Sequence, residues 1–488
     1  MTPTVFFLGF LFLSNFHLTH VQSDEQGFIS IDLFQKGIDF GKDLIIKKGV
    51  SSLTPLELPQ IEKAVKIKLI GTVHLTLSDI NLYKVDVSSS TVQPGENGLV
   101  LIVSGAKASL SMNWGYKYGT LIVISDKGTA SVQVESMDIS LTLNGKNQEG
   151  NLNLSLTDCG CKVNNISIKL DGGASWLYQI FVEAFEKKIR SAIEVAITKQ
   201  IQNIITDLNP LLQTIPKEIR VDKISSINVT FVNDPVLDGS SIGVAINGLL
   251  SAINRTTGFD HRIQNIQSLS SCGRRPAKMG GISIHQNVLN SASAVYFNAG
   301  VMHLVLDKLP EQYLLNTAEW KYIIPQLYKK YPNADMILNI SISSPPILSV
   351  SHQSIDATIY ADITVGILDA GERVPVACIS SLSTISCYPD ISRDNITGSI
   401  KLNDFNMFLN WSNIGVLHMD LLQPFTETLL RTVAVPYLNL IFYWGLPLPT
   451  FKGYTLSNAK FSYVGSSVLI CTNVHQVKKR KYYPVADQ

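Results

Sequence analysis

The sequence predicts an α+β protein of two similar domains, and three observations support that prediction. The 488 residues exceed what one compact core usually holds. Long stretches alternate between apolar and polar residues, as half-buried antiparallel strands do. Segments of helical period flank these stretches in both halves, so the order helix, long strands, helix, strand occurs twice. Accidental similarity between two unrelated β-rich domains is the alternative.

The first half begins with a helical period over 31–50, which ends before Pro55. A strand of about twice the usual length is expected over 65–78. Later strands change phase after Val103 and Val134, as β-bulges make them do. A second helix is expected over 175–208. Its broad apolar face includes these candidate lipid-contacting residues: Leu177, Ile180, Phe181, Phe185 and Ile189.

The second half repeats the pattern. A helix is expected over 317–331, either kinked at Pro325 or starting there. Strands follow over 336–342 and 355–367. The second helix runs from Asp420 to about Val435, with Pro424 in its first turn. The expected organisation is therefore a signal segment (1–23), a first domain (24–250), a linker region (251–285) and a second domain (286–488).

Composition and charge exclude several classes of protein. Hydrophobic residues make up 45% of the chain and charged residues 16%, which is incompatible with wholesale disorder. Forty Lys and Arg stand against 39 Asp and Glu, a formal charge of +1, so no overall field attracts nucleic acid or anionic membranes. Phosphate loops, dinucleotide fingerprints, His-Glu-x-x-His and Cys-x-x-Cys motifs are absent. We therefore expect no cofactor and no metal.

The N-terminus is typical of a secretory signal. Val5–Leu13 is a run of nine apolar residues or glycine, shorter than the roughly 20 residues that span a membrane. Cleavage is expected after Ser23, and a buried N-terminal helix is the alternative. Seven glycosylation sequons support export to the extracellular space: Asn153, Asn165, Asn228, Asn254, Asn339, Asn395 and Asn410.

Export to an oxidising compartment would also permit disulfides. Cys378 and Cys387 lie nine positions apart across Ser-rich sequence, a spacing that suits two facing strands. The remaining four cysteines cannot be paired from the sequence alone: Cys159, Cys161, Cys272 and Cys471.

One motif matches an enzyme. Residues 239–243 read Gly-Ser-Ser-Ile-Gly, and in hydrolases such a serine sits on a turn between a strand and a helix. Here Asn233-Asp234-Pro235 precedes the motif and another strand is expected after it. A hairpin turn is therefore favoured over a nucleophile at Ser241, and we expect no enzyme.

The apolar faces of the predicted helices suggest a function other than catalysis. A long helix on a strongly coiled sheet can leave a dry, elongated cavity suited to acyl chains. The alternative is that side chains fill the space. Four aromatic residues are expected to be core or interface anchors: Trp114, Trp176, Trp320 and Tyr443.

The second half contains four distinctive short motifs: 328–333 (Tyr-Lys-Lys-Tyr-Pro-Asn), 343–346 (Ser-Ser-Pro-Pro), 412–415 (Ser-Asn-Ile-Gly) and 446–449 (Leu-Pro-Leu-Pro). These motifs resemble the family of bactericidal permeability-increasing and lipopolysaccharide-binding proteins. Residues 66–68, 176–177 and 187–189 fit the same family in the first half. Two further motifs resemble its plant branch: 159–161 (Cys-Gly-Cys) and 173–176 (Gly-Ala-Ser-Trp).

The resemblance implies a boomerang of two barrels, each a strongly coiled antiparallel sheet wrapped around a long helix, joined by a central sheet. It implies a phospholipid in an apolar pocket of each barrel and, in some members, recognition of lipid A at the tip of the first. It also implies a first-domain disulfide from Cys159 or Cys161 to the long helix. Residues 175–208 contain no cysteine, so that pairing has no partner there.

Charge is a second departure from the family. Residues 24–250 contain 21 Lys and Arg against 24 Asp and Glu, a net charge of −3, whereas the strongly bactericidal members are basic there. The candidate cations for a lipopolysaccharide-binding tip are Lys63, Lys66, Lys68 and Lys117. Ordinary solvated strand faces are the alternative interpretation of these lysines.

The leading hypothesis is therefore a secreted, monomeric lipid-binding protein. It would recognise lipopolysaccharide or a related amphiphile in innate defence and contact bacterial or host membrane surfaces transiently. A carrier of phospholipid or neutral lipid without immune recognition is the alternative.

Overall fold

The computed structural model describes residues 27–95, 97–172, 175–253, 272, 278–308, 312–369, 371–392, 395–447, 450–451 and 454–476. The expected signal segment and most of the expected linker, with Asn254, lie outside these residues. The chain forms two compact units. Unit 1 comprises Asp32–Ile215 and Phe231–Val244, and the described part of unit 2 comprises the remaining segments.

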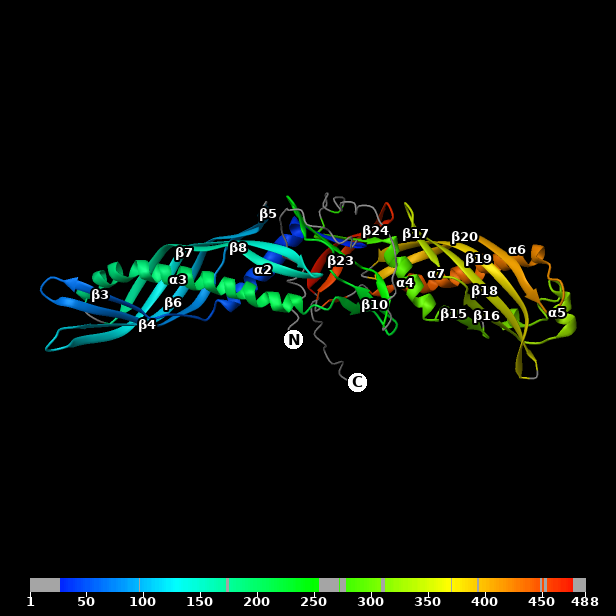
Figure 1. Cartoon of the computed structure of the whole chain (residues 1–488), viewed down its shortest axis with the longest axis horizontal. Helices are drawn as coiled ribbons and strands as arrows, with labels where there is room; N and C mark the ends of the chain where they lie inside the picture. Colours follow the sequence, from blue (N-terminus) through cyan, green and yellow to red (C-terminus); the bar gives the residue numbers. More distant parts are fainter. Residues whose placement is uncertain are drawn as a thin grey trace, which may run out of the picture. The chain divides into compact units, whose positions relative to one another are not determined.

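Unit 1 contains a seven-stranded antiparallel sheet in the order β2-β4-β6-β7-β8, with β3 paired to β4 and β5 paired to β6 (Figure 1). The strands are β2 (Leu56–Leu58), β3 (Ile61–Ile67), β4 (Gly71–Asp86), β5 (Ser89–Gly95), β6 (Gly98–Tyr118), β7 (Ile124–Gln148) and β8 (Asn151–Asp171). A hairpin of β11 (Val236–Asp238) and β12 (Ser241–Ile246) follows later in the chain.

The predicted phase changes are confirmed as irregularities in strand pairing. The register of β6 with β7 shifts between Val103 and Ala106, and the register of β7 with β8 shifts between Val134 and Met137. On β6 the inward side chains, such as Trp114, are buried. A Cβ atom on Gly128 would fall 2.8 Å from the Trp114 ring, so the tryptophan requires glycine on the neighbouring strand.

The single long strand predicted over 65–78 is wrong. The segment forms the end of β3, a turn over 68–70 and the start of β4. Val65 pairs with Val73, so residues of the same parity share one face on both strands. The alternation of apolar and polar residues therefore continues through the turn, and periodicity alone cannot detect the turn.

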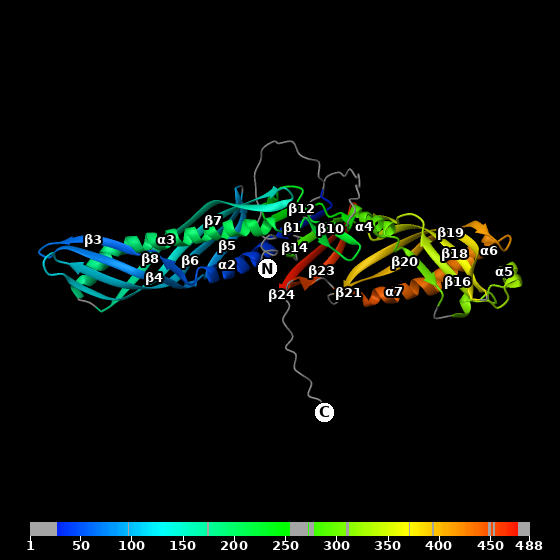
Figure 2. The ribbon, with the colours of Figure 1, turned by 60° about the horizontal axis from the view of Figure 1, so that its bottom comes forward.

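Two helices belong to unit 1. The predicted first helix is shorter than expected, because 31–34 belongs to β1 (Ile29–Phe34) and α2 spans Gln35–Ser52. The second, α3 (Ser175–Gln213), extends five residues beyond its predicted end and includes Pro210. In both views α3 lies along the sheet (Figures 1 and 2), and its apolar side chains join the main core of the unit.

Unit 2 contains a second seven-stranded antiparallel sheet in the order β15-β16-β18-β19-β20-β21, with β17 paired to β18. The strands are β15 (His303–Leu306), β16 (Met336–Ile342), β17 (Ile347–Val350), β18 (Ile355–Asp369), β19 (Glu372–Ser392), β20 (Asn395–Ser412) and β21 (Leu446–Pro447). Together with the first sheet, this confirms the α+β fold class.

Shorter strands complete unit 2. One sheet has the order β13-β10-β9, with β9 (Glu218–Arg220), β10 (Ser225–Asn228) and β13 (Leu250–Ala252). A run of antiparallel pairs joins β14 (Gly280–His285), β24 (Ser467–Gln476), β23 (Tyr454–Val464) and β22 (Thr450–Phe451).

The helices of unit 2 agree only partly with prediction. They are α4 (Gln286–Asn298), a 3₁₀ turn (Gln312–Leu315), α5 (Pro325–Lys330), α6 (Met419–Leu429), a π-helical turn (Leu430–Ala434) and α7 (Val435–Trp444). Helix α5 starts at Pro325, which is one of the two predicted alternatives. The later helix continues well beyond Val435, and Pro424 lies in its second turn rather than its first.

A side-chain network ties β10 to α4. Asp222 accepts hydrogen bonds from the Tyr296 hydroxyl at 2.6 Å and from the backbone N–H groups of Ile224 and Ser225 at 2.8 Å. These bonds, the tyrosine bond foremost, lower the pKa of the Asp222 carboxyl from 3.8 to about 2.

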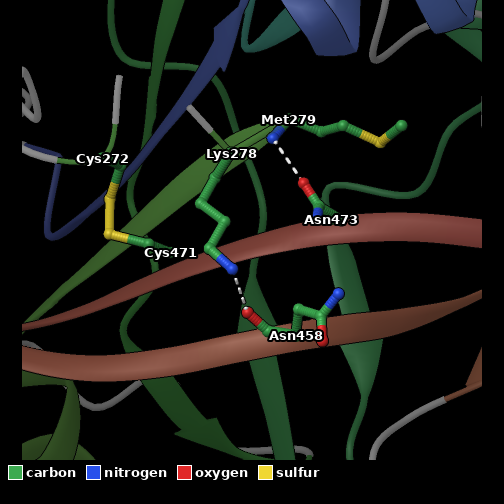
Figure 3. The surroundings of a disulfide bond; sticks show 6 residues. All are labelled: Cys272, Lys278, Met279, Asn458, Cys471 and Asn473. Carbon is green, nitrogen blue, oxygen red and sulfur yellow. Dashed lines mark hydrogen bonds between the residues drawn. A yellow bond between two sulfur atoms is a disulfide. The ribbon is translucent and has the colours of Figure 1, made fainter. Parts of the chain in front are cut away.

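One disulfide is present among the described residues, between Cys272 and Cys471, with their Cα atoms 5.3 Å apart (Figure 3). Beside it, Lys278 Nζ donates to the Asn458 carbonyl at 2.6 Å. The Met279 N–H donates to Asn473 Oδ1 at 3.0 Å. These contacts join the start of β14 to β23 and β24.

Candidate functional site

Along its N-terminal half, α3 packs its predicted lipid-contacting residues into the protein core. Phe181, Phe185 and Ile189 are each at most 1% exposed, and the two phenylalanine rings lie 4.7 Å apart. Ile180 is half-buried, and the side chain of Leu177 lies outside the described residues. The structure therefore brings three of these residues together in the core of unit 1.

A groove of about 650 Å³ opens in unit 1 between α2 and the β4–β5 connection. Lys42 Nζ donates to the Ser90 carbonyl at 3.0 Å and lies 3.1 Å from the Asp43 carboxylate. The lining combines four apolar side chains with charged and hydroxyl groups: Ile46, Val50, Val85, Val87, Lys42, Lys47, Asp43, Asp86, Ser51 and Ser88–Ser90. Such a mixture suits an amphiphile better than a purely apolar ligand.

Helix α7 carries an apolar surface that the sequence analysis did not predict. None of its residues is buried. Seven of its apolar side chains are between 41% and 74% exposed: Tyr437, Leu438, Leu440, Ile441, Phe442, Tyr443 and Trp444. We name these seven residues the α7 surface. Soluble proteins seldom expose so continuous an apolar surface without a binding role.

Polar contacts hold α7 and the π-helical turn against β20. Asn439 Oδ1 accepts from the Ile400 N–H at 2.6 Å, and Asn439 Nδ2 donates to the Ile400 carbonyl at 3.0 Å. The guanidinium of Arg431 donates to the carbonyls of Leu402 and Asn403. These hydrogen bonds fix the helix to the strand without burying the α7 surface. Single π-helical turns are frequent at functional sites.

Tyr443 is not a core residue, since its side chain is 74% exposed, and its expected role as an interface anchor stays a prediction. Trp114 is a buried anchor, as expected, and Trp320 packs edge-on against Phe425 at 5.2 Å. The side chain of Trp176 lies outside the described residues. The sequence feature that could have indicated the α7 surface is the group of apolar residues over 433–449. This segment is too interrupted to be a membrane span.

The four candidate tip lysines do not share one face. Lys66 and Lys117 are exposed on β3 and β6, and Lys68 is exposed in the β3–β4 turn. Lys63 instead faces α3, where its Nζ donates to the Ala184 carbonyl at 3.0 Å. Lys127 on β7 is also exposed and was not predicted, because no motif distinguishes it.

Ser241 lies at the start of β12, where it pairs with Asp238 of β11 across a tight hairpin. A strand therefore follows the serine in place of the helix that a nucleophile elbow requires. Among the described residues, no group of three or more His, Cys, Asp or Glu side chains is placed to hold a metal ion.

The predicted pairing of Cys378 with Cys387 is wrong. Both thiols are free, and both residues lie on β19, where nine residues span roughly 30 Å. A disulfide needs Cα atoms within about 7 Å. Cys159 is also free, on β8 beside Cys161. Burial, with the Glu194 carboxylate nearby, raises the pKa of the Cys161 thiol to about 12.

Three of the sequon asparagines are exposed on strands: Asn165, Asn339 and Asn410. Asn153, Asn228 and Asn395 are half-buried, and Asn254 lies outside the described residues. None of the described helices is both long enough and apolar enough to cross a bilayer.

Two descriptions of one family match most of the chain. The N-terminal domain of the LBP / BPI / CETP family matches residues 37–211, and its C-terminal domain matches residues 219–476. The chain belongs to this family. A BPI/LBP family protein of Arabidopsis thaliana is 45% identical over 96% of both chains. The bactericidal permeability-increasing protein of Sebastes schlegelii is 27% identical, over 91% of this chain and 94% of that protein.

The fold of the LBP / BPI / CETP family is also found by structural comparison. The crystal structure of a lipopolysaccharide binding protein matches with a TM-score of 0.59 and 20% identity, covering 93% of this chain and all of that one. The similarity expected from the short motifs is confirmed, including that to a plant member.

Proposed function

We propose that this chain is an exported lipid-binding protein that takes up lipopolysaccharide or a related amphiphile, in innate defence against bacteria. The proposal rests chiefly on the exposure of the α7 surface. Each Leu, Ile or Phe side chain left in water forgoes about 1.5–3 kcal/mol that burial against an acyl chain would recover. The LBP / BPI / CETP family membership and the names of the relatives support the same ligand class.

Export and glycosylation belong to this proposal. The expected signal segment and the sequons support them, and the Cys272–Cys471 disulfide is compatible with an oxidising compartment. We also propose the expected domain boundaries and a monomeric state. The ligands of the protein would be lipids, and it would bind neither a cofactor nor nucleic acid.

Native mass spectrometry of the intact chain tests the function. We expect lipid to co-purify, and the double variant Leu440→Asp/Ile441→Asp to reduce the lipid-bound fraction at least tenfold, since two charges oppose acyl-chain contact. Ile347→Asp is the matched control, because Ile347 is also exposed (58%) and lies on β17 of the same unit. Equal lipid in all three proteins would exclude the α7 surface as the site.

The identity of the bound lipid separates the two candidate functions. A glycolipid carrying phosphates, such as lipid A, would favour recognition of bacteria. Phospholipid or sterol ester alone would favour a carrier. The net charge of −3 over 24–250 and the contact of Lys63 with α3 are the observations that favour the carrier.

A further inference from the structure

The sheet of unit 2 carries exposed aromatic side chains on the face that points away from its core. Phe408 on β20 pairs with Ser380 on β19, and Trp411 pairs with Cys378. Because Cys378 and Ser380 are two residues apart on one strand, Phe408 and Trp411 lie on the same face of the sheet. Ile379, between these two residues of β19, belongs to the core of the unit, so the shared face is the outer one.

A further aromatic residue lies on the same outer face. Tyr360 on β18 pairs with Leu382, which is two residues from Ser380 along β19. The exposed fractions are 61% for Phe408, 42% for Tyr360 and 38% for Trp411. We name these three aromatic residues the outer aromatic surface. Large aromatic side chains gathered in contact with water usually mark a place where something else binds.

A glycosylation sequon lies inside the outer aromatic surface. It consists of Asn410, Trp411 and Ser412. Consecutive residues of β19 pair with Leu409 and Trp411, so Asn410 is the extra residue of a β-bulge. Asn410 is exposed, and its side chain makes no hydrogen bond to a described residue. The sequon therefore presents a free amide between two exposed aromatic rings.

Other sequon amides are used within the fold. Asn228 Oδ1 accepts a hydrogen bond from the Thr230 N–H at 2.9 Å. Asn395 Nδ2 donates to the Trp444 carbonyl at 3.3 Å. A bulky sugar on either of these asparagines would compete with such contacts, whereas one on Asn410 would not.

Phe408 precedes Asn410 by two positions, an arrangement that no other sequon of the chain has. The residues two positions before the other six asparagines are not aromatic: Asn151, Val163, Ser226, Ala252, Ile337 and Arg393. Residues two apart on a strand are about 7 Å apart and project from the same face. A sugar attached to Asn410 would therefore lie beside the Phe408 ring.

We propose that Asn410 carries an N-linked glycan whose first N-acetylglucosamine stacks on Phe408 and covers part of the outer aromatic surface. The Asn410 amide nitrogen displaces the diphosphate from C1 of the terminal sugar of a lipid-linked oligosaccharide and loses one proton, so an N–C bond replaces a C–O bond. One face of the sugar ring consists of C–H groups, which bury apolar area against the phenylalanine ring. The inference rests on the proposed export, because exported chains receive such glycans.

Site-resolved mass spectrometry of the full chain, secreted by a eukaryotic host, tests the modification. We expect a glycan on Asn410, and its loss in Asn410→Gln. An Asn410 that stays unmodified while other sequons carry glycans would overturn the proposal. If no sequon carries a glycan, the proposed export fails together with it.

A double-mutant cycle tests the contact between sugar and ring. Urea unfolding is measured for wild type, Phe408→Ser, Asn410→Gln and the double variant. In the glycosylated protein, Asn410→Gln should raise the unfolding equilibrium constant about threefold to tenfold when Phe408 is present, as expected for the loss of a stacked ring pair. It should have no effect in the Phe408→Ser background. An equal effect in both backgrounds would show that the glycan does not contact the ring, and the proposal would be wrong.

Two controls assign the effect to the glycan on Asn410. The same four proteins made in the bacterial periplasm form disulfides but receive no such glycan, so the coupling should vanish. Asn339→Gln is the matched variant, because Asn339 is an exposed sequon asparagine on β16 of the same sheet, and Ile337, two positions earlier, is 6% exposed. It should not couple to Phe408. Coupling that persists without glycans would contradict the proposal.

The lipid proposal and the glycan proposal can fail separately. Asn410→Gln leaves the α7 surface unchanged, so it should retain as much co-purified lipid as wild type. If no lipid co-purifies but the glycan couples to Phe408, the proposed lipid binding fails and the glycan contact stands. If lipid co-purifies and the glycan does not couple to Phe408, the glycan contact fails alone.

Discussion

Asp222 shows how a single exposed carboxylate can fix a local structure. Its two oxygens accept three hydrogen bonds from Tyr296 and from the backbone of the turn before β10, which favours the ionised form. A carboxylate with a lowered pKa makes folding depend on pH, because the unfolded chain binds the proton more tightly than the folded chain.

Asp222→Asn should therefore remove part of the acid sensitivity of unit 2. The carboxyl has its ordinary pKa of 3.8 when unfolded and about 2 when folded. Its ionised form thus contributes stability fully above pH 4, and this is lost as the pH falls through 2. The variant should be less stable than wild type near neutral pH, with the difference shrinking in acid. Urea unfolding at several pH values would measure this, with Asp207→Asn as an exposed control. A constant difference would contradict the assignment.

The cysteines show where residue-scale prediction fails. Nine positions between Cys378 and Cys387 can mean two facing strands or one long strand, and the sequence contains no turn signal that decides. The true pair is separated by 199 residues, so no local pattern could indicate it.

At the scale of elements, α3 was predictable and α7 was not. The apolar period of α3 identifies its buried face, and Phe185 is fully buried there. The bulges after Val103 and Val134 were predictable for the same reason, since a phase change is visible in the sequence. Whether an apolar helix is covered depends on what packs against it, and α7 lies beside β20 with none of its residues buried, which periodicity does not reveal.

Phe185→Ala tests whether the α3 face is core or cavity lining. If side chains fill the space, the variant should lose about 3–5 kcal/mol of unfolding free energy, since a large side chain leaves a void in a packed core. Val195→Ala, on the exposed side of α3, should lose well under 1 kcal/mol. Denaturant unfolding would measure both. A loss below about 1 kcal/mol for Phe185→Ala would indicate an open cavity there.

At the scale of the whole molecule, a single covalent link joins distant parts of unit 2. The segment between Cys272 and Cys471 contains every strand of the second sheet and the helices α4 to α7. Closing so long a loop restricts the unfolded chain strongly, and the loss of such a bond typically costs about 2–5 kcal/mol.

Cys272→Ser/Cys471→Ser should accordingly lower the unfolding free energy of unit 2 by that amount. Before reduction, the denatured wild-type chain should titrate with four thiols, matching the four free cysteines. The double variant should titrate with the same number. Six reactive thiols in the unreduced wild type would show that the bond is absent.

The same bond turns residues 272–471 into a closed covalent ring. A protease that cuts the backbone once inside this ring opens it without separating the two fragments, because each fragment keeps one cysteine of the disulfide. The nicked protein therefore keeps its full mass until a reductant is added, and its fragments can remain paired in the β14–β24 ladder. A cut in the preceding segments, by contrast, releases a fragment whenever the non-covalent contacts fail.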